Sequence, residues 1–272
     1  MTQAPILDAP ILQISWLELA LSGGLILMAA GLSRSFRTGL SGSFLLGALR
    51  TVVQLTLVGY VLVYVFSVEQ WWLVLAALAL MTAVATREAV QRQDGPPGKL
   101  YGITGLALAL GAGLTLVYVS AVVVRPDPWY NPRYLIPLFG MIISSAMNAA
   151  ALAAERLAGE MESRRREIEA RLALGADAVE ASREPVRRAI RAASIPIMNQ
   201  LMIVGIVALP GMMTGQIISG TSPLTAVRYQ IVVMFMLAAA VAVSAAGVAA
   251  WYRREFFSDA LQFRPPGRES TA

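Results

Sequence analysis

The sequence predicts an all-α, polytopic membrane protein, and three observations support this fold class. Of the 272 residues, 57% are hydrophobic and only 14% are charged, whereas soluble domains average about 45–50% apolar and about 25% charged residues. The mean hydropathy is +0.62. Seven apolar windows approach or exceed the length of about 20 residues that a helix needs to cross a bilayer. This composition excludes a water-soluble enzyme, a disordered chain and a secreted disulfide scaffold.

Each of the seven windows is predicted to form a membrane-spanning helix. Residues 1–14 contain no Lys or Arg, so the first window is expected to be a retained span and not a signal peptide. The third window opens with the aromatic pair Trp71 and Trp72. The sixth window is interrupted by Pro210 and Gly211, which break or kink a helix. In chain order the windows are residues 15–32, 44–66, 71–86, 100–124, 134–154, 195–218 and 226–251.

The distribution of basic residues predicts the orientation of the chain. Of the 22 Lys and Arg residues, 18 fall in one set of alternate connections and 3 lie in or at the border of the other set. Cytoplasmic loops carry the excess of Lys and Arg, so the N-terminus is predicted outside and the C-terminus in the cytoplasm. The net charge of +5 therefore indicates topology in a multi-pass protein of the cytoplasmic (inner) membrane, and no nucleic-acid partner is expected.

Residues 155–193 form the largest charged segment and are predicted to be a cytoplasmic helical elbow. They hold 17 of the 39 charged residues. The apolar spacing of the first part favours an amphipathic helix that extends the fifth span and ends at Gly175. Asp177 is expected to cap a short second helix, and Pro185 to start a third that returns to the sixth span. The chain contains no GxxxxGK[ST] phosphate-binding loop.

The chemistry that is missing restricts the function further. The chain has no Cys and no His, so it lacks thiolate and imidazole ligands, bases and nucleophiles. The carboxylates nearest to the spans, Glu18 and Glu155, lie at span ends. No catalytic residue, cofactor or tight metal site is therefore expected, and the chain is predicted not to be an enzyme. A proton relay through acidic residues also has little support.

Seven residues are candidates for a transport pathway or gate. For Arg50 and Gln54 in the second window, the alternatives are a polar strip along a pathway and an arginine that snorkels to the headgroups. For Asn148 in the fifth window, the alternative is helix packing through small polar residues. Broken helices often mark transport pathways, although a purely structural kink is the other interpretation. The sixth window contributes Asn199, Pro210, Gly211 and Gln216.

Five stretches of the sequence resemble one family. They are residues 49–55 (LRTVVQL), 137–148 (from PLFGMI to MN), 167–176 (EIEARLALGA), 209–217 (LPGMMTGQI) and 229–231 (YQI). Together they resemble the FetB-type permeases of bacterial iron-export ABC transporters, whose plant relatives act in aluminium tolerance. The resemblance covers residues 15–257. It implies a single permease domain over residues 1–257 that works as a homodimer with a separate ATP-binding subunit. Residues 258–272 are predicted to be a disordered cytoplasmic tail.

The resemblance also implies a role for the elbow. Importer-like ABC permeases carry a loop of the form EAA, three residues, then G, and Glu169-Ala170 followed by Gly175 matches this spacing, although Arg171 replaces the second Ala. Docking of the elbow into a groove of the ATP-binding subunit is therefore expected. The alternative is a helix that lies on membrane lipid headgroups. The expected contact residues are Glu169, Leu172, Leu174, Gly175 and Val179.

The cargo stays open at the level of sequence. The resemblance implies iron, but Arg50 and the absence of deep carboxylates favour an anionic or organic solute such as a nucleotide sugar. A proton-driven carrier is a third possibility. If iron is the cargo, we expect a weak, hydrated or carbonyl-lined route, or iron bound to a carrier molecule.

Overall fold

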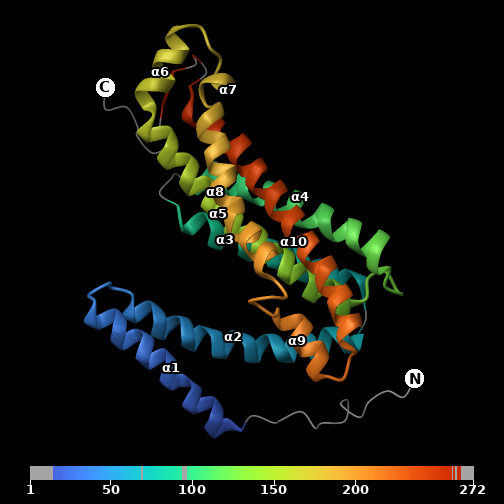
Figure 1. Cartoon of the computed structure of the whole chain (residues 1–272). Coiled ribbons are helices and arrows are strands. Elements are labelled where there is room, and N and C mark those ends of the chain that lie inside the picture. Colours follow the sequence, from blue (N-terminus) through green and yellow to red (C-terminus); the bar gives the residue numbers. More distant parts are fainter. Residues whose placement is uncertain (1–14, 69, 94–96, 259, 261, 265–272) are drawn as a thin grey trace. The chain divides into compact units, whose positions relative to one another are not determined.

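The computed structural model describes residues 15–68, 70–93, 97–258, 260 and 262–264, and it confirms the predicted all-α class. Within these residues the only β-pairing consists of two isolated bridges, Val204 with Ala208 and Phe257 with Phe263. The helices, labelled in Figure 1, are α1 (Trp16–Ser35), α2 (Ser41–Val68), α3 (Trp71–Gln91), α4 (Pro97–Tyr118), the π-helix η1 (Val119–Val124), α5 (Pro132–Ser163), α6 (Arg165–Ala173), α7 (Ala178–Ala181), α8 (Arg183–Ile203), α9 (Gly211–Ile218), α10 (Pro223–Tyr252) and the 3₁₀ helix η2 (Arg253–Phe256).

The described helices divide into two compact units, one formed by α1 and α2 with residues 218–221 and the other by the remaining helices. In the first unit α1 packs against α2. Helix α1 begins with a capping box, in which the Ser15 hydroxyl accepts from the Glu18 backbone and the Glu18 carboxylate accepts from the Ser15 backbone. Most side chains of both helices are exposed, and most of the exposed ones are apolar, as expected for membrane spans.

The second unit is built around α5 and α10, which pack against each other and against α4 and α8. Their facing sides are rich in alanine, and small residues allow membrane helices to approach closely. The closest approach of α4 to α10 is at Gly111, where a Cβ atom would collide with the Ser244 side chain. The Ser244 hydroxyl donates across this contact to the Ala107 carbonyl at 3.3 Å. This packing fixes the helices that line the cavity described below.

Among the described residues, six helices are long and apolar enough to cross a membrane, at the positions of six of the seven predicted windows. The sixth window, residues 195–218, is not one continuous helix. Helix α8 ends at Ile203, and α9 begins at Gly211. The predicted orientation of the termini stays a prediction.

The break in the sixth window begins earlier than predicted, because the helix stops seven residues before Pro210. Gly205 adopts a left-handed conformation (φ +83°) that favours glycine. Its N–H donates to the Ala208 carbonyl at 2.9 Å, and the Val207 N–H donates to the Ile203 carbonyl at 2.9 Å. The turn thus satisfies part of its own backbone, which irregular chain near lipid requires. Pro210 is the last residue of the break, and Gly211 is the first residue of α9.

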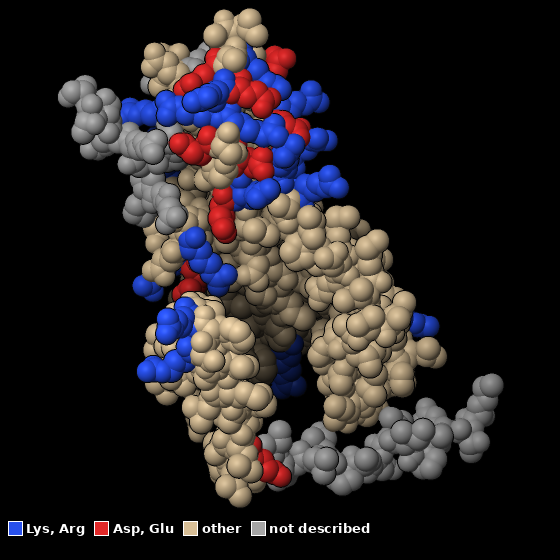
Figure 2. All heavy atoms as spheres, turned by 60° about the vertical axis from the view of Figure 1, so that its left-hand side comes forward, with Lys and Arg blue, Asp and Glu red and all other residues tan. Residues whose placement is uncertain are grey.

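The predicted elbow over residues 155–193 is helical, as expected. Helix α5 has 32 residues, about 48 Å at 1.5 Å per residue, and so is longer than the roughly 30 Å hydrocarbon core. Its apolar stripe continues into α6, since Leu157, Met161 and Ile168 are buried and Leu172 packs against them. Gly175 (φ +92°) ends this arm, and the Asp177 carboxylate caps α7 by accepting from the Glu180 N–H. Figure 2 shows charged side chains gathered over this end of the second unit.

The predicted tail, residues 258–272, is described only in part. Phe263 is buried against Phe256, and the Arg264 N–H donates to the Phe256 carbonyl at 2.7 Å. The Arg165 guanidinium lies 5.7 Å from the centre of the Phe263 ring. The predicted disorder therefore does not extend to Phe263, because aromatic burial holds this part of the chain. Residues 259, 261 and 265–272 lie outside the described part.

Candidate functional site

Helices α5 and α8 line an open cavity of about 200 Å³, to which α10 contributes Val241. Its polar groups are all neutral, namely the hydroxyl of Ser145 and the amides of Asn148 and Gln200. Its apolar wall consists of Ala149, Leu152, Ala193, Pro196, Ile197 and Val241. Amide and hydroxyl oxygens can accept hydrogen bonds from a hydrated ion or a polar solute, but they provide no fixed charge. The cavity is therefore suited to weak, reversible contact with a polar cargo.

A single positive charge approaches this cavity from α3. The Arg92 guanidinium lies 3.5 Å from the Asn148 amide oxygen, at the long limit of a hydrogen bond. Arg92 follows the last residue of α3 and is exposed. This contact places a positive charge beside the amide of Asn148.

The other predicted pathway residues do not join this cavity. Asn199 is exposed on α8, next to Gln200 but not among the lining residues. Pro210, Gly211 and Gln216 belong to the start and body of α9. In the first unit, Arg50 and Gln54 lie on α2, four residues apart and exposed. Of the seven candidates, Asn148 alone lines the cavity among the residues that the structure describes.

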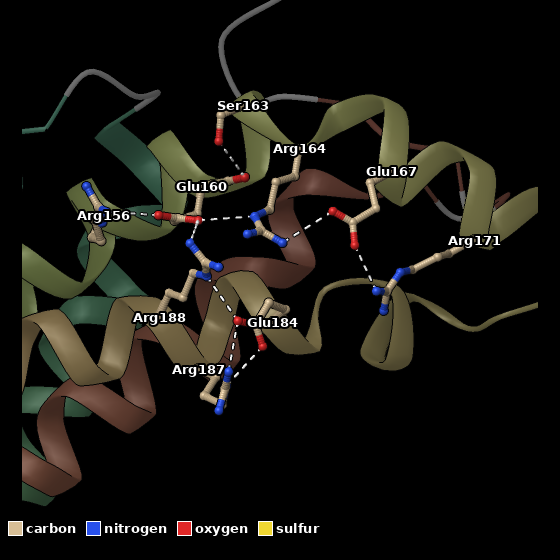
Figure 3. A network of polar contacts seen from close by, with 9 residues as sticks. All are labelled: Arg156, Glu160, Ser163, Arg164, Glu167, Arg171, Glu184, Arg187 and Arg188. Atoms are coloured by element: carbon tan, nitrogen blue, oxygen red, sulfur yellow. Dashed lines mark hydrogen bonds and ion pairs between the residues drawn. The ribbon is translucent and has the colours of Figure 1, made fainter.

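The elbow is held by a network of ion pairs centred on Glu160 (Figure 3). The Glu160 side chain is only 9% exposed, and its carboxylate lies 3.0 Å from Arg156, 3.3 Å from Arg164 and 3.8 Å from Arg188. The pairs with Arg156 and Arg164 both have the i, i+4 spacing that favours ion pairs on one helix face. Arg188 comes from α8, so Glu160 connects the two arms of the elbow. Replacing this carboxylate should be costly, because Arg156 would lose its ion pair and Arg164 and Arg188 would each lose one of two carboxylate partners.

The network extends from Glu160 along both arms. On α8 the Glu184 carboxylate accepts from Arg187 at 2.9 and 3.0 Å and from Arg188 at 3.0 Å. These hydrogen bonds, that of Arg187 first, lower the pKa of Glu184 from its ordinary 4.5 to about 2. Toward α6, Glu167 pairs with Arg164 at 3.2 Å and with Arg171 at 2.8 Å. The elbow therefore behaves as one connected body.

The tip of the elbow presents apolar side chains to the outside. Leu174 is 89% exposed and Val179 is 51% exposed. Gly175 lies between them in the turn, and Glu169 is paired with Arg165 at 2.8 Å. Leu172 instead packs inward against the core. Of the five predicted contact residues, Leu174 and Val179 are thus the exposed apolar ones.

Some important residues were not selected from the sequence. Gln200 and Ser145 are separated by more than 50 positions, so only the packing of α5 on α8 brings them together. The role of Glu160 as a connector was equally invisible, because Arg188 is 28 positions away. The described part of the chain holds no group of three or more Asp, Glu, His or Cys side chains that could bind a metal ion.

Comparison with known proteins places the chain in a family. The model of the uncharacterised protein family UPF0014 matches residues 16–257. The UPF0014 membrane protein slr1647 of Synechocystis is 39% identical over 94% of this chain and 99% of its own length. Protein ALUMINUM SENSITIVE 3 of Arabidopsis thaliana is 34% identical, over 88% of this chain and 86% of its own.

A third relative carries a functional name. The protein named "Probable iron export permease protein FetB" of Escherichia coli is 36% identical over 81% of this chain and 83% of its own length. No solved structure matches the chain. The predicted resemblance is confirmed, and the chain belongs to the UPF0014 family of membrane permease proteins, the family of FetB and ALUMINUM SENSITIVE 3.

Proposed function

We propose that this chain is the membrane-spanning subunit of an ABC transporter that exports iron across the cytoplasmic membrane. Two copies pair with two ATP-binding subunits, which hydrolyse the ATP. The observation that carries this proposal is the exposure of Leu174 and Val179 at the tip of an otherwise charged elbow. Exposed apolar side chains on a short helical turn are suited to a groove of a partner protein.

The architecture provides a route from the docking surface to the cavity. Helices α5 and α8 form the two arms of the elbow and also line the cavity. From Glu160 to Asn148 the distance along α5 is about 18 Å, and Arg188 and Gln200 are equally far apart along α8. Because Glu160 ties the arms together, movement of the tip would shift both helices jointly. The break at residues 204–210 allows α8 to move without carrying α9 as one rigid rod.

Iron as the cargo rests on the name of the relative FetB and must be reconciled with a neutral cavity. The side chains of Ser145, Asn148 and Gln200 offer oxygens without charge. A hard cation that binds tightly needs several oxygen ligands, usually including carboxylates. Iron would therefore cross as a hydrated ion or in a complex, held weakly enough to be released.

The docking step is tested by measuring ATP turnover of the co-expressed ATP-binding subunit in the presence of this chain. The Leu174→Gln/Val179→Gln double variant should reduce stimulated turnover at least tenfold at limiting concentrations, since burial of one such side chain is worth about 1.5–3 kcal/mol. Ala173→Gln, at the neighbouring exposed position, is the matched control and should leave turnover within twofold. Unchanged stimulation in the double variant would overturn the assignment.

A further inference from the structure

A second cavity, of about 390 Å³, lies at the base of the elbow between α5 and the first half of α8. Its wall combines four arginines with one carboxylate and two small or apolar side chains. The lining residues are Arg156, Glu184, Arg187, Arg188, Arg191, Ala192 and Ile195.

The charge of this cavity is not balanced by its own carboxylates. Glu184 lies in the wall, and Glu160 contacts Arg156 and Arg188 from behind. Four guanidinium groups thus face two carboxylates, an excess of two positive charges. Arg191 is exposed and forms no ion pair with any residue that the structure describes. The excess is available to an anion from outside.

The arginines are prepared for such an anion. Glu184 holds Arg187 through two hydrogen bonds and Arg188 through one, as Figure 3 shows. A guanidinium whose position is already fixed loses less conformational entropy on binding. Its planar fork matches the geometry of two phosphate oxygens.

Below the arginines, the same side of α8 becomes apolar. Ile195, Met198 and Met202 are exposed and follow Arg191 at intervals of four, three and four residues, which places them on one helix face. From Arg191 to Met202 this face is about 16 Å long. That is close to half of the roughly 30 Å hydrocarbon core, the depth of one leaflet. This helix face therefore has a positively charged end at Arg191 and an apolar strip about as long as one leaflet of the hydrocarbon core is deep.

We propose that this cavity binds the phosphate of an anionic phospholipid from the leaflet on the elbow side, with an acyl chain along Ile195, Met198 and Met202. The charge selects an anionic headgroup, and the apolar strip selects a lipid over a free phosphate ion. Basic pockets between helices at this level of a membrane protein have the chemistry for such headgroups. The site adjoins the Glu160 network, so bound lipid would brace the joint between the arms.

The experiment uses the full-length chain in neutral detergent and counts bound lipid by native mass spectrometry. The probes are dioleoyl phosphatidylglycerol and dioleoyl phosphatidylcholine. The wild-type chain should bind the anionic lipid at least fivefold more tightly, and added salt should reduce the difference. Arg191→Gln should weaken phosphatidylglycerol binding about fivefold, the effect of one arginine near an anionic surface. Arg183→Gln is the control, an exposed arginine on the same helix outside the cavity.

Further arms separate lipid from other anions. Ile195→Ser should weaken binding of phosphatidylglycerol. In a chain that already carries Ile195→Ser, Arg191→Gln should weaken binding by the same factor as in the wild-type chain. Equal loss in Arg183→Gln would show general surface attraction and overturn the proposal. So would displacement of the lipid by millimolar inorganic phosphate, or equal binding of phosphatidylcholine by the wild-type chain. Circular dichroism and gel filtration verify folding of each variant, and the salt and competition measurements need the wild-type chain alone.

Discussion

Helices α5 and α8 run side by side and line two cavities, one with charged side chains and one with neutral side chains. At the elbow, four arginines and a carboxylate line a space of about 390 Å³. Only about 12 Å along α5, between Arg156 and Asn148, the next cavity of about 200 Å³ is lined by neutral side chains. Charged side chains thus gather at the elbow, where we propose that an anion binds, and neutral ones line the cavity that we propose a cargo contacts. Both cavities lie along the same two helices, so a movement of α5 and α8 would affect both.

The largest effect is expected at the carboxylate that joins the two arms. Glu160→Gln removes a carboxylate that three arginines share and should reduce the free energy of unfolding by about 2–3 kcal/mol. This loss lies at or below the lower end of the range of about 3–5 kcal/mol for breaking a buried ion pair, because the arginines are partly exposed. Thermal unfolding in detergent measures it. Glu155→Gln, an exposed position on the same helix, should stay within about 0.5 kcal/mol. Equal stability of both variants would refute a structural role of the network.

Substitutions in the wall of the neutral cavity should change the rate of transport and leave the stability of the fold unchanged. Gln200→Leu removes an amide from the cavity wall and should reduce ATP-dependent transport about tenfold, the equivalent of one lost neutral hydrogen bond. The unfolding temperature should change little. The adjacent Asn199→Leu is the control, because Asn199 does not line the cavity. If Asn199→Leu impaired transport more than Gln200→Leu, the pathway would lie on the other side of α8.

The smallest expected effect is the pH dependence of the stabilisation that Glu184 provides. Hydrogen bonds from Arg187 and Arg188 lower the pKa of Glu184 from 4.5 to about 2. Because the folded-state pKa is depressed, the stabilisation is complete above about pH 4.5 and is lost as the pH falls toward 2. The difference in unfolding temperature between the wild-type chain and Glu184→Gln should be constant from pH 7 to 5 and shrink below that. A difference that grew on acidification would contradict the assignment.

Local features of the fold could be predicted from the sequence, since they depend on residues close together in the chain. The buried stripe of Leu157, Met161 and Ile168, the turn at Gly175 and the cap at Asp177 all follow from spacing or backbone preference. Six predicted windows coincide with long apolar helices for the same reason.

Features that depend on packing between distant segments could not be predicted. The neutral cavity requires Asn148 and Gln200 to meet across two helices, and the network requires Arg188 to reach Glu160. The sequence predicts the interruption of the sixth window at Pro210 and Gly211, whereas α8 already ends at Ile203 and the left-handed turn lies at Gly205. The Pro265-Pro266-Gly267 sequence predicts a disordered tail, but composition does not reveal that Phe263 is buried against Phe256.

The most direct test of the central claim is iron transport into inside-out proteoliposomes that contain this chain and its ATP-binding subunit. Fe²⁺ should accumulate only with hydrolysable ATP, and its accumulation should fall at least tenfold in Leu174→Gln/Val179→Gln but not in Ala173→Gln. Accumulation that persists without ATP and disappears with the proton gradient would contradict this claim. ATP-dependent uptake of an anionic solute without iron would support the assignment as an ABC transporter and refute iron as its cargo.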